Sequence, residues 1–126
     1  VLHLLSIITA VILATFISYL LWCLVGLTGF YTTNVWGVYT MVMGVNMFLT
    51  GTLVPLEFMP SWLQAIVYWL PFQNIVYTPV SIYLGNIALA DVPGKLLIQL
   101  MWIIIMYIIV RLYYKLGLRK LVIQGG

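Results

Sequence analysis

The sequence predicts an all-α integral membrane protein, a polytopic bundle of helices that forms one domain over residues 1–126. Hydrophobic residues make up 65% of the chain and charged residues 6%, against about 25% charged residues in a soluble domain. The mean hydropathy is +1.19, and the first charged side chain along the sequence is Glu57. Soluble enzymes, nucleic-acid-binding proteins and disordered chains are therefore excluded, and the expected surroundings are a lipid bilayer.

Three apolar segments are each predicted to cross the membrane, at residues 4–25, 38–54 and 95–116. Each approaches the length of about 20 residues that crosses a hydrocarbon core roughly 30 Å thick. In the first segment, small residues recur every fourth position and form a stripe that favours close helix packing. The stripe consists of Ser6, Ala10, Ala14 and Ser18. Pro55 is predicted to end the second segment.

The second segment carries glycines at seven-residue spacing, which places them on one face of a helix. Because glycine costs about 1 kcal/mol relative to alanine inside a helix, this face is expected to pack closely on another helix. That helix belongs either to the same chain or to a second subunit. The predicted packing face consists of Gly37, Thr40, Gly44, Met47 and Gly51.

Residues 61–85 are predicted to form a re-entrant helical hairpin rather than a continuous helix. A capping box of Ser61 and Gln64 would start the first helix, Pro71 would interrupt it, and Gly85 would end the second. Neither half reaches the length of about 20 residues needed to cross a membrane. The alternative is a sharply kinked fourth span.

The hairpin is the candidate gate, because irregular backbone at membrane depth is tolerated only against protein or a water-filled cavity. Glu57 is predicted to lie at the outer mouth of a path, or else to be a solvated carboxylate at the interface. The candidate gate residues are Pro55, Glu57, Pro60, Pro71, Phe72, Gln73 and Asn74.

The distribution of charge predicts the topology. Four of the five basic residues follow position 110 and form a basic anchor, which consists of Arg111, Lys115, Arg119 and Lys120. The excess of positive charge on cytoplasmic segments places the C-terminus in the cytoplasm. Counting back, the hairpin and Val1 lie outside and the turn at 26–37 lies inside. If residues 61–85 cross the membrane completely, Val1 and the turn exchange sides.

The polar residues predict no catalytic site, metal site or cofactor. The chain has one His, one Cys and two acidic residues in all, and these are widely separated. It also lacks the glycine-rich loop with Lys and Ser or Thr that binds nucleotide phosphates. The protein is therefore not expected to be an enzyme.

Several motifs resemble the C-terminal half of ABC-2 family permeases over about residues 37–126. They are GTLVPLEFMP at 51–60, Trp62-Leu63, LPFQ at 70–73, Tyr77-Thr78-Pro79, Gly85, Gln99 with Trp102, and Gln124-Gly125-Gly126. The resemblance implies a membrane subunit of an ATP-binding-cassette exporter in the bacterial plasma membrane. A complete subunit would have six helices, and this chain would carry the fourth to sixth, with two short re-entrant helices before the last.

The resemblance also implies two partners, a separate ATPase subunit and a second permease subunit that is identical or different. The first three helices and the region that contacts the ATPase would be missing from this chain. The alternative function is a non-transporting membrane anchor or assembly subunit of a larger complex, which fits the composition and the glycine spacing equally well.

Overall fold

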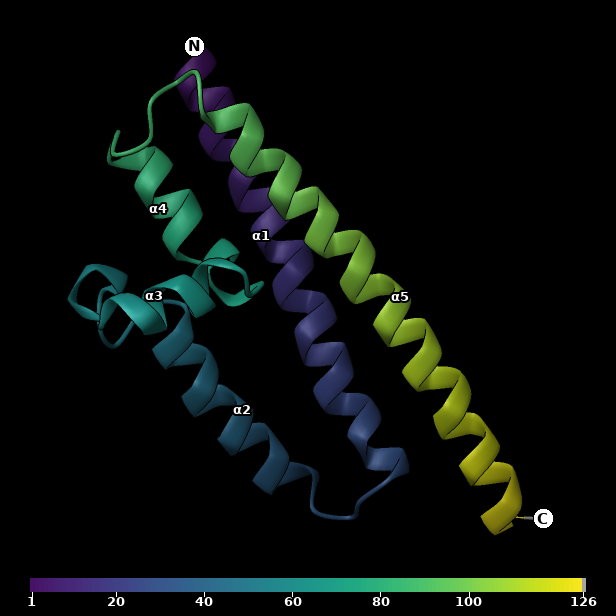
Figure 1. The fold of residues 1–126 in the computed structure, drawn as a ribbon. Helices are drawn as coiled ribbons and strands as arrows, with labels where there is room; N and C mark the ends of the chain where they lie inside the picture. The colour runs from purple at the N-terminus through teal and green to yellow at the C-terminus, as the bar shows by residue number, and fades with distance from the viewer. Residues whose placement is uncertain (126) are drawn as a thin grey trace.

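The structure, a computed structural model, describes residues 1–125 and is built from helices and turns (Figure 1). This confirms the all-helical prediction. The α-helices are α1 (Leu2–Leu27), α2 (Val35–Leu49), α3 (Ser61–Tyr68), α4 (Tyr77–Tyr83) and α5 (Val92–Gly125). Short 3-10 turns η1 (Thr28–Phe30), η2 (Leu56–Phe58) and η3 (Phe72–Asn74) connect them.

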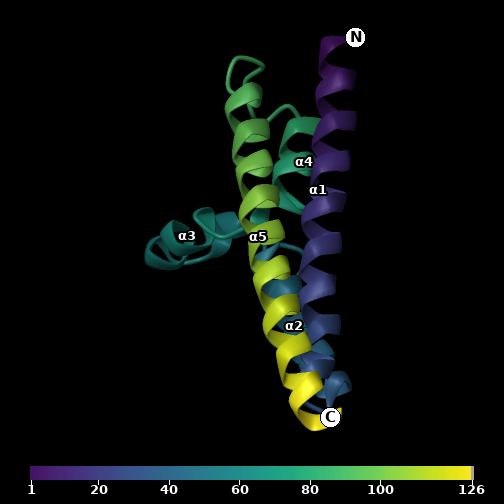
Figure 2. The ribbon, with the colours of Figure 1, turned by 90° about the vertical axis from the view of Figure 1, so that its right-hand side faces the viewer.

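The two long helices α1 and α5 run parallel and side by side along the whole molecule (Figures 1 and 2). They contain 26 and 34 residues, and at 1.5 Å per residue their lengths are about 39 and 51 Å. Both are long and apolar enough to cross a membrane. The predicted spans 4–25 and 95–116 lie within them.

The small-residue stripe of α1 lies partly in the interior, as predicted. Ala10 and Ala14 are buried, and Ala10 packs in one cluster with Ile82 of α4 and Val92 of α5. Large apolar side chains such as Phe16 on α1 are exposed instead. The inward face of α1 also contains the large residues Ile17, Leu20 and Leu21. Small residues at Ala10 and Ala14 let helices approach closely there, as is typical of helices that pack within a lipid environment.

Helix α2 is shorter than the predicted span 38–54, and the boundaries of that prediction are wrong. It begins at Val35 because Asn34 is its N-cap, whose Oδ1 accepts a hydrogen bond from the Gly37 N–H at 3.0 Å. It ends at Leu49, before Pro55, because Gly51 adopts a φ of 81°, the left-handed conformation that commonly terminates a helix. Its 15 residues extend only about 22 Å.

The predicted break in residues 61–85 is present, but the arrangement differs from an antiparallel hairpin. Helix α2 ends near the middle of α1, α3 lies crosswise there, and α4 continues toward the end of the molecule that holds Val1 (Figures 1 and 2). Gly85 ends α4 as predicted, with a φ of 74°. The Gly85 N–H donates to the Ile82 carbonyl at 3.1 Å and the Asn86 N–H to the Ser81 carbonyl at 3.0 Å, which is a Schellman motif.

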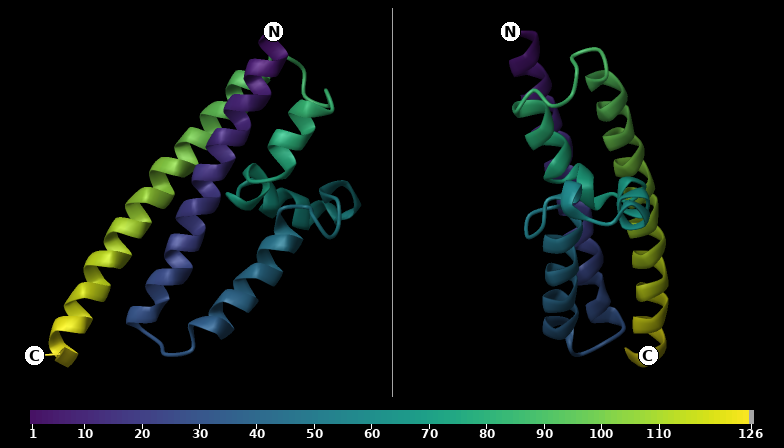
Figure 3. Two further views of the ribbon diagram at one scale, coloured as in Figure 1. Left: turned by 180° about the vertical axis from the view of Figure 1, so that it is seen from behind. Right: turned by 60° about the vertical axis from the view of Figure 1, so that its left-hand side comes forward.

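The turn between α1 and α2 lies at the same end as the end of α5, and Val1 lies at the opposite end near the loop between α4 and α5 (Figure 3). The turn is attached to α5 through Tyr31, whose hydroxyl donates to the Tyr113 carbonyl at 3.2 Å. The two tyrosine rings stack with centroids 4.7 Å apart. Gly117 of α5 lies against Phe30 of this turn.

Replacing Gly117 with alanine tests this attachment. A Cβ at Gly117 would lie 2.7 Å from Cδ2 and 3.1 Å from Cβ of Phe30, so Gly117→Ala is expected to lower the free energy of unfolding by about 1–3 kcal/mol. The matched control is Gly94→Ala in the same helix, where a Cβ meets no described heavy atom within 4 Å. The thermal unfolding midpoint in one detergent should fall for Gly117→Ala alone. Equal midpoints would contradict the attachment.

Candidate functional site

The irregular segment between α3 and α4 brings polar side chains into the interior. Helix α3 ends at Tyr68, and the chain continues through the buried Pro71 into η3. Proline has no N–H group, so a continuous helix cannot pass this point without losing a hydrogen bond. Gln73 and Asn74 follow and are almost completely buried, with exposed fractions of 5% and 1%.

Gln99 of α5 connects this segment to both long helices. Its side chain is 0% exposed, and its Nε2 donates to the backbone carbonyls of Ala10 at 3.2 Å and of Asn74 at 2.9 Å. Thr78 of α4 donates its hydroxyl proton to Asn74 Oδ1 at 3.2 Å. Asn74, Thr78 and Gln99 are together called the polar node below. The node joins α1, η3, α4 and α5.

The geometry of the Gln99 amide leaves two polar atoms of the node without a partner. Both carbonyls that Gln99 faces are acceptors, so its NH₂ group must point toward them and its Oε1 must point elsewhere. Within residues 1–125, Gln99 Oε1 and Asn74 Nδ2 are buried and form no hydrogen bond. One is an acceptor and the other a donor, and leaving such a group unpaired in the interior costs about 1–3 kcal/mol.

Two further glutamines stabilise the irregular backbone beside α3. Gln73 Nε2 donates to the Tyr68 carbonyl at the end of α3, at 2.6 Å. The two protons of Gln64 Nε2 are shared among the carbonyls of Leu56, Glu57 and Met59, which lie 2.8, 3.2 and 3.0 Å from the nitrogen. The predicted capping box of Ser61 and Gln64 is therefore wrong. The η2 loop folds back over α3 and occupies the Gln64 amide, and Pro60 is an N-cap without a side-chain hydrogen bond.

The predicted gate residues divide between two places. Pro71, Gln73 and Asn74 are buried and Phe72 is half-buried, packed beside the cluster that contains Leu20 and Met106. By contrast, Pro55, Glu57 and Pro60 are exposed on the loop around η2.

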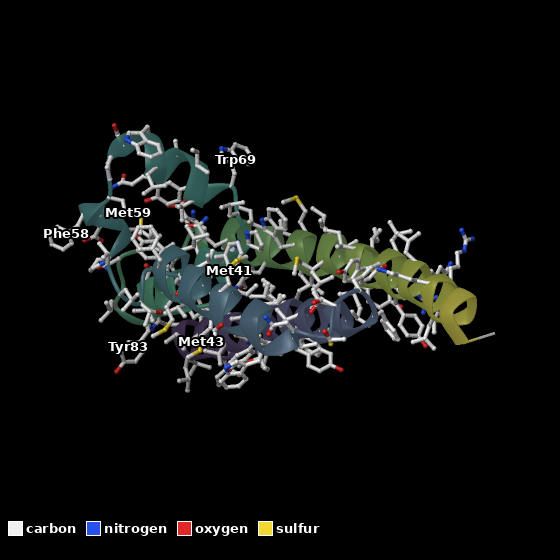
Figure 4. All side chains as sticks on the ribbon, turned by 90° about the horizontal axis from the view of Figure 1, so that it is seen from below. Met41, Met43, Phe58, Met59, Trp69 and Tyr83 are labelled. Atoms are coloured by element: carbon white, nitrogen blue, oxygen red, sulfur yellow. The ribbon has the colours of Figure 1, made fainter. Side chains whose placement is uncertain are left out.

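Side chains of the η2 loop and of the end of α3 differ in whether they point outward or into the protein. Phe58 and Trp69 are each 79% exposed and project away from the bundle, whereas Met59 is buried (Figure 4). The structure therefore does not bring the seven predicted gate residues into one cluster.

The predicted packing face of α2 is also divided. Gly37 lies beside the side chain of the Asn34 cap, where a Cβ would be 2.8 Å from Nδ2. Thr40 donates its hydroxyl proton to the carbonyls of Trp36 and Gly37. Gly51 follows the helix rather than lying on it. Of these three glycines only Gly44 faces open space, since no described heavy atom lies within 4 Å of a Cβ built there.

The basic anchor occupies the end of α5 that contacts the α1–α2 turn. Arg111, Lys115 and Arg119 are exposed, and the ammonium of Lys120 lies 5.1 Å from the centre of the Tyr31 ring. Among the described residues, no group of three or more His, Cys, Asp or Glu side chains is placed to hold a metal ion.

Sequence reasoning did not predict the central place of Gln99 and Thr78. Both residues were named only as parts of motifs in the family resemblance, although Gln99 is an uncharged polar residue inside an apolar segment. Such residues commonly form hydrogen bonds between membrane helices, so this signal was available. Thr78 carries no comparable signal, because its role depends on where η3 places Asn74.

Two long apolar helices and a broken helix fastened by polar side chains define a helical membrane protein. The chain belongs to a transporter family: a family model described as ABC-2 family transporter protein matches residues 1–125. The resemblance noted over residues 37–126 is thereby confirmed, and the match also includes α1. The family implies a general role as the membrane permease of an ABC transporter, typically a non-catalytic subunit that works with an ATPase. Neither the curated proteins nor the solved structures give a match.

Replacing Gln99 with leucine should loosen the polar node. The substitution removes both donated hydrogen bonds and leaves the Asn74 carbonyl unpaired, which is expected to cost about 1–3 kcal/mol. Hydrogen exchange measured by mass spectrometry should then accelerate in residues 72–83. Gln64→Leu is the matched control, because its hydrogen bonds all go to residues 56–59 and exchange should accelerate there instead. The same exchange pattern in both variants would contradict the assignment.

Proposed function

We propose that this chain is part of the permease subunit of an ABC exporter in the bacterial plasma membrane. A separate ATPase subunit supplies the energy by hydrolysing ATP, and movement of the permease carries substrate across the bilayer. Membership of the family supports the general role. The proposed cytoplasmic location of the C-terminus rests on the basic anchor at the end of α5. The turn after α1 would then also be cytoplasmic, and the α4–α5 loop would face outside.

The part of the chain proposed as the gate is η3 with α4. The observation that carries this proposal is the polar node, which fastens α4 to the two long helices through hydrogen bonds of Gln99 and Thr78. The structure is proposed to be the closed arrangement of the gate. The node is incompletely paired in it, since Gln99 Oε1 and Asn74 Nδ2 are buried without partners in residues 1–125. Movement of α4 that admits water would satisfy both atoms and so offset part of the cost of opening.

A cross-link between α1 and α4 tests the gate. His3 Nε2 lies 2.9 Å from the Ile82 carbonyl, and the neighbouring Tyr83 is exposed. In a Cys23→Ser background, His3→Cys and Tyr83→Cys are joined by a short bismaleimide in the assembled transporter in nanodiscs. Because α4 can then no longer leave α1, ATP hydrolysis should fall to the rate of the ATPase subunit alone.

The control cross-link joins α1 to α5, which are proposed to move together. Phe16 and Ile104 line one groove between these helices, and both are exposed, so Phe16→Cys with Ile104→Cys is the matched pair. This cross-link should leave the rate of ATP hydrolysis unchanged. An unchanged rate with the α1–α4 cross-link would show that α4 is not a gate, while the permease role would stand.

A second permease subunit is proposed to pack on α2 around Gly44. Because a Cβ at this position meets no described atom of the same chain within 4 Å, Gly44→Leu should leave the fold of one subunit intact. It should abolish the dimer, measured by light scattering in detergent, since bulky side chains prevent close backbone contact between membrane helices. Gly94→Leu, equally unhindered in α5, should remain dimeric. Dimers in both variants would exclude this face as the interface.

A further inference from the structure

The end of the molecule that carries the α1–α2 turn concentrates positive charge. Four basic residues occur within about three turns of α5, and the two acidic residues of the chain, Glu57 and Asp91, lie elsewhere. Glu57 belongs to η2, and Asp91 precedes α5. Within residues 1–125, this end therefore has no carboxylate side chain with which to neutralise its cations. These four residues, Arg111, Lys115, Arg119 and Lys120, are called the cationic end below.

Aromatic rings surround the cationic end at the same level of the bundle. Phe30 and Tyr31 of the turn contact Tyr114 and Tyr113 of α5, with ring centroids 6.3 and 4.7 Å apart. Trp36 stacks on Tyr39 at the start of α2. Tyrosine and tryptophan gather where hydrocarbon meets lipid headgroups, so this collar of rings indicates the depth of the membrane boundary.

The length of α5 gives the same depth independently. The uncharged part of α5 begins at Leu96, directly after Lys95. Counting from there about 20 residues, the length that crosses the hydrocarbon core, ends at Lys115. Arg119 is then one helical turn farther, about 6 Å beyond the core. The headgroup layer on each side is about 5–8 Å thick. Both estimates therefore place Arg119 and Lys120 beside lipid headgroups rather than in bulk water.

The Lys120 side chain is held in a defined position. Its ammonium lies 5.1 Å from the centre of the Tyr31 ring, and that ring stacks in turn on Tyr113. A cation over an aromatic face gains about 0.5–1 kcal/mol at an exposed site. Lys120 is therefore directed toward the turn and its aromatic collar instead of extending away from α5, and the adjacent Arg119 is exposed.

From these observations we infer that the cationic end binds the phosphate headgroup of an anionic phospholipid, with Arg119 and Lys120 as its principal contacts. Negatively charged headgroups neutralise cations that no carboxylate side chain within residues 1–125 reaches, and the ring of Tyr31 positions one of the two. This ligand site goes beyond the proposed transport function and does not depend on it. An acidic surface of a protein partner is the competing occupant, and the depth of Arg119 and Lys120 favours lipid.

The test measures binding of phosphatidylglycerol to the purified protein by native mass spectrometry, without the ATPase subunit. Each basic residue near an anionic surface contributes about a fivefold change in binding. Arg119→Gln with Lys120→Gln is therefore expected to weaken binding about 25-fold, and Lys95→Gln at the opposite end no more than about fivefold. Arg119→Lys with Lys120→Arg retains the charge and should retain the affinity.

A further variant separates the position of Lys120 from its charge. Tyr31→Leu removes the ring beneath the ammonium and should weaken phosphatidylglycerol binding about two- to fivefold. Wild-type affinity in Arg119→Gln/Lys120→Gln would overturn the lipid site. So would an affinity no weaker than that of Lys95→Gln, since the effect would then be one of net charge. If the double variant kept its lipid affinity but no longer bound the ATPase subunit, the occupant would be the acidic protein surface instead.

Discussion

The hydrogen bonds of the Gln99 amide are the interaction on which the arrangement of the broken helix depends. Apolar contacts alone distinguish poorly between neighbouring positions of a helix in lipid, because lipid tails solvate apolar side chains as well as other helices do. A buried amide that faces two carbonyls is more selective, since a shift of one residue would leave donors and acceptors unpaired. Gln99 therefore specifies where η3 lies along α1 and α5.

Local signals in the sequence were sufficient to predict the broken region. Pro71 interrupts the hydrogen bonding of a helix wherever it occurs, and Gly85 favours the left-handed conformation seen at the end of α4. The two long helices were equally predictable, because their hydrophobic length is a property of the segment itself. These features needed no knowledge of neighbouring elements.

Features set by tertiary contacts could not be predicted in this way. Ser61 and Gln64 have the spacing of a capping box, but the η2 loop supplies three carbonyls to the Gln64 amide and the box does not form. The glycines at 37, 44 and 51 share a spacing but have three different surroundings. Periodicity describes only the direction of a side chain from its own helix, so it cannot show what lies opposite or where the helix ends.

The path from α2 to α4 separates the shape of the protein's lateral surface from the direction in which the chain runs through the bundle. A continuous helix would link these two properties. Helices α2 and α4 point in the same general direction (Figure 1), and α3 is a sideways excursion between them. Their 15 and 7 residues total 22, which is about the length of one ordinary crossing. A lengthened or resequenced α3 would therefore alter the lateral surface of the protein while α5 kept its direction.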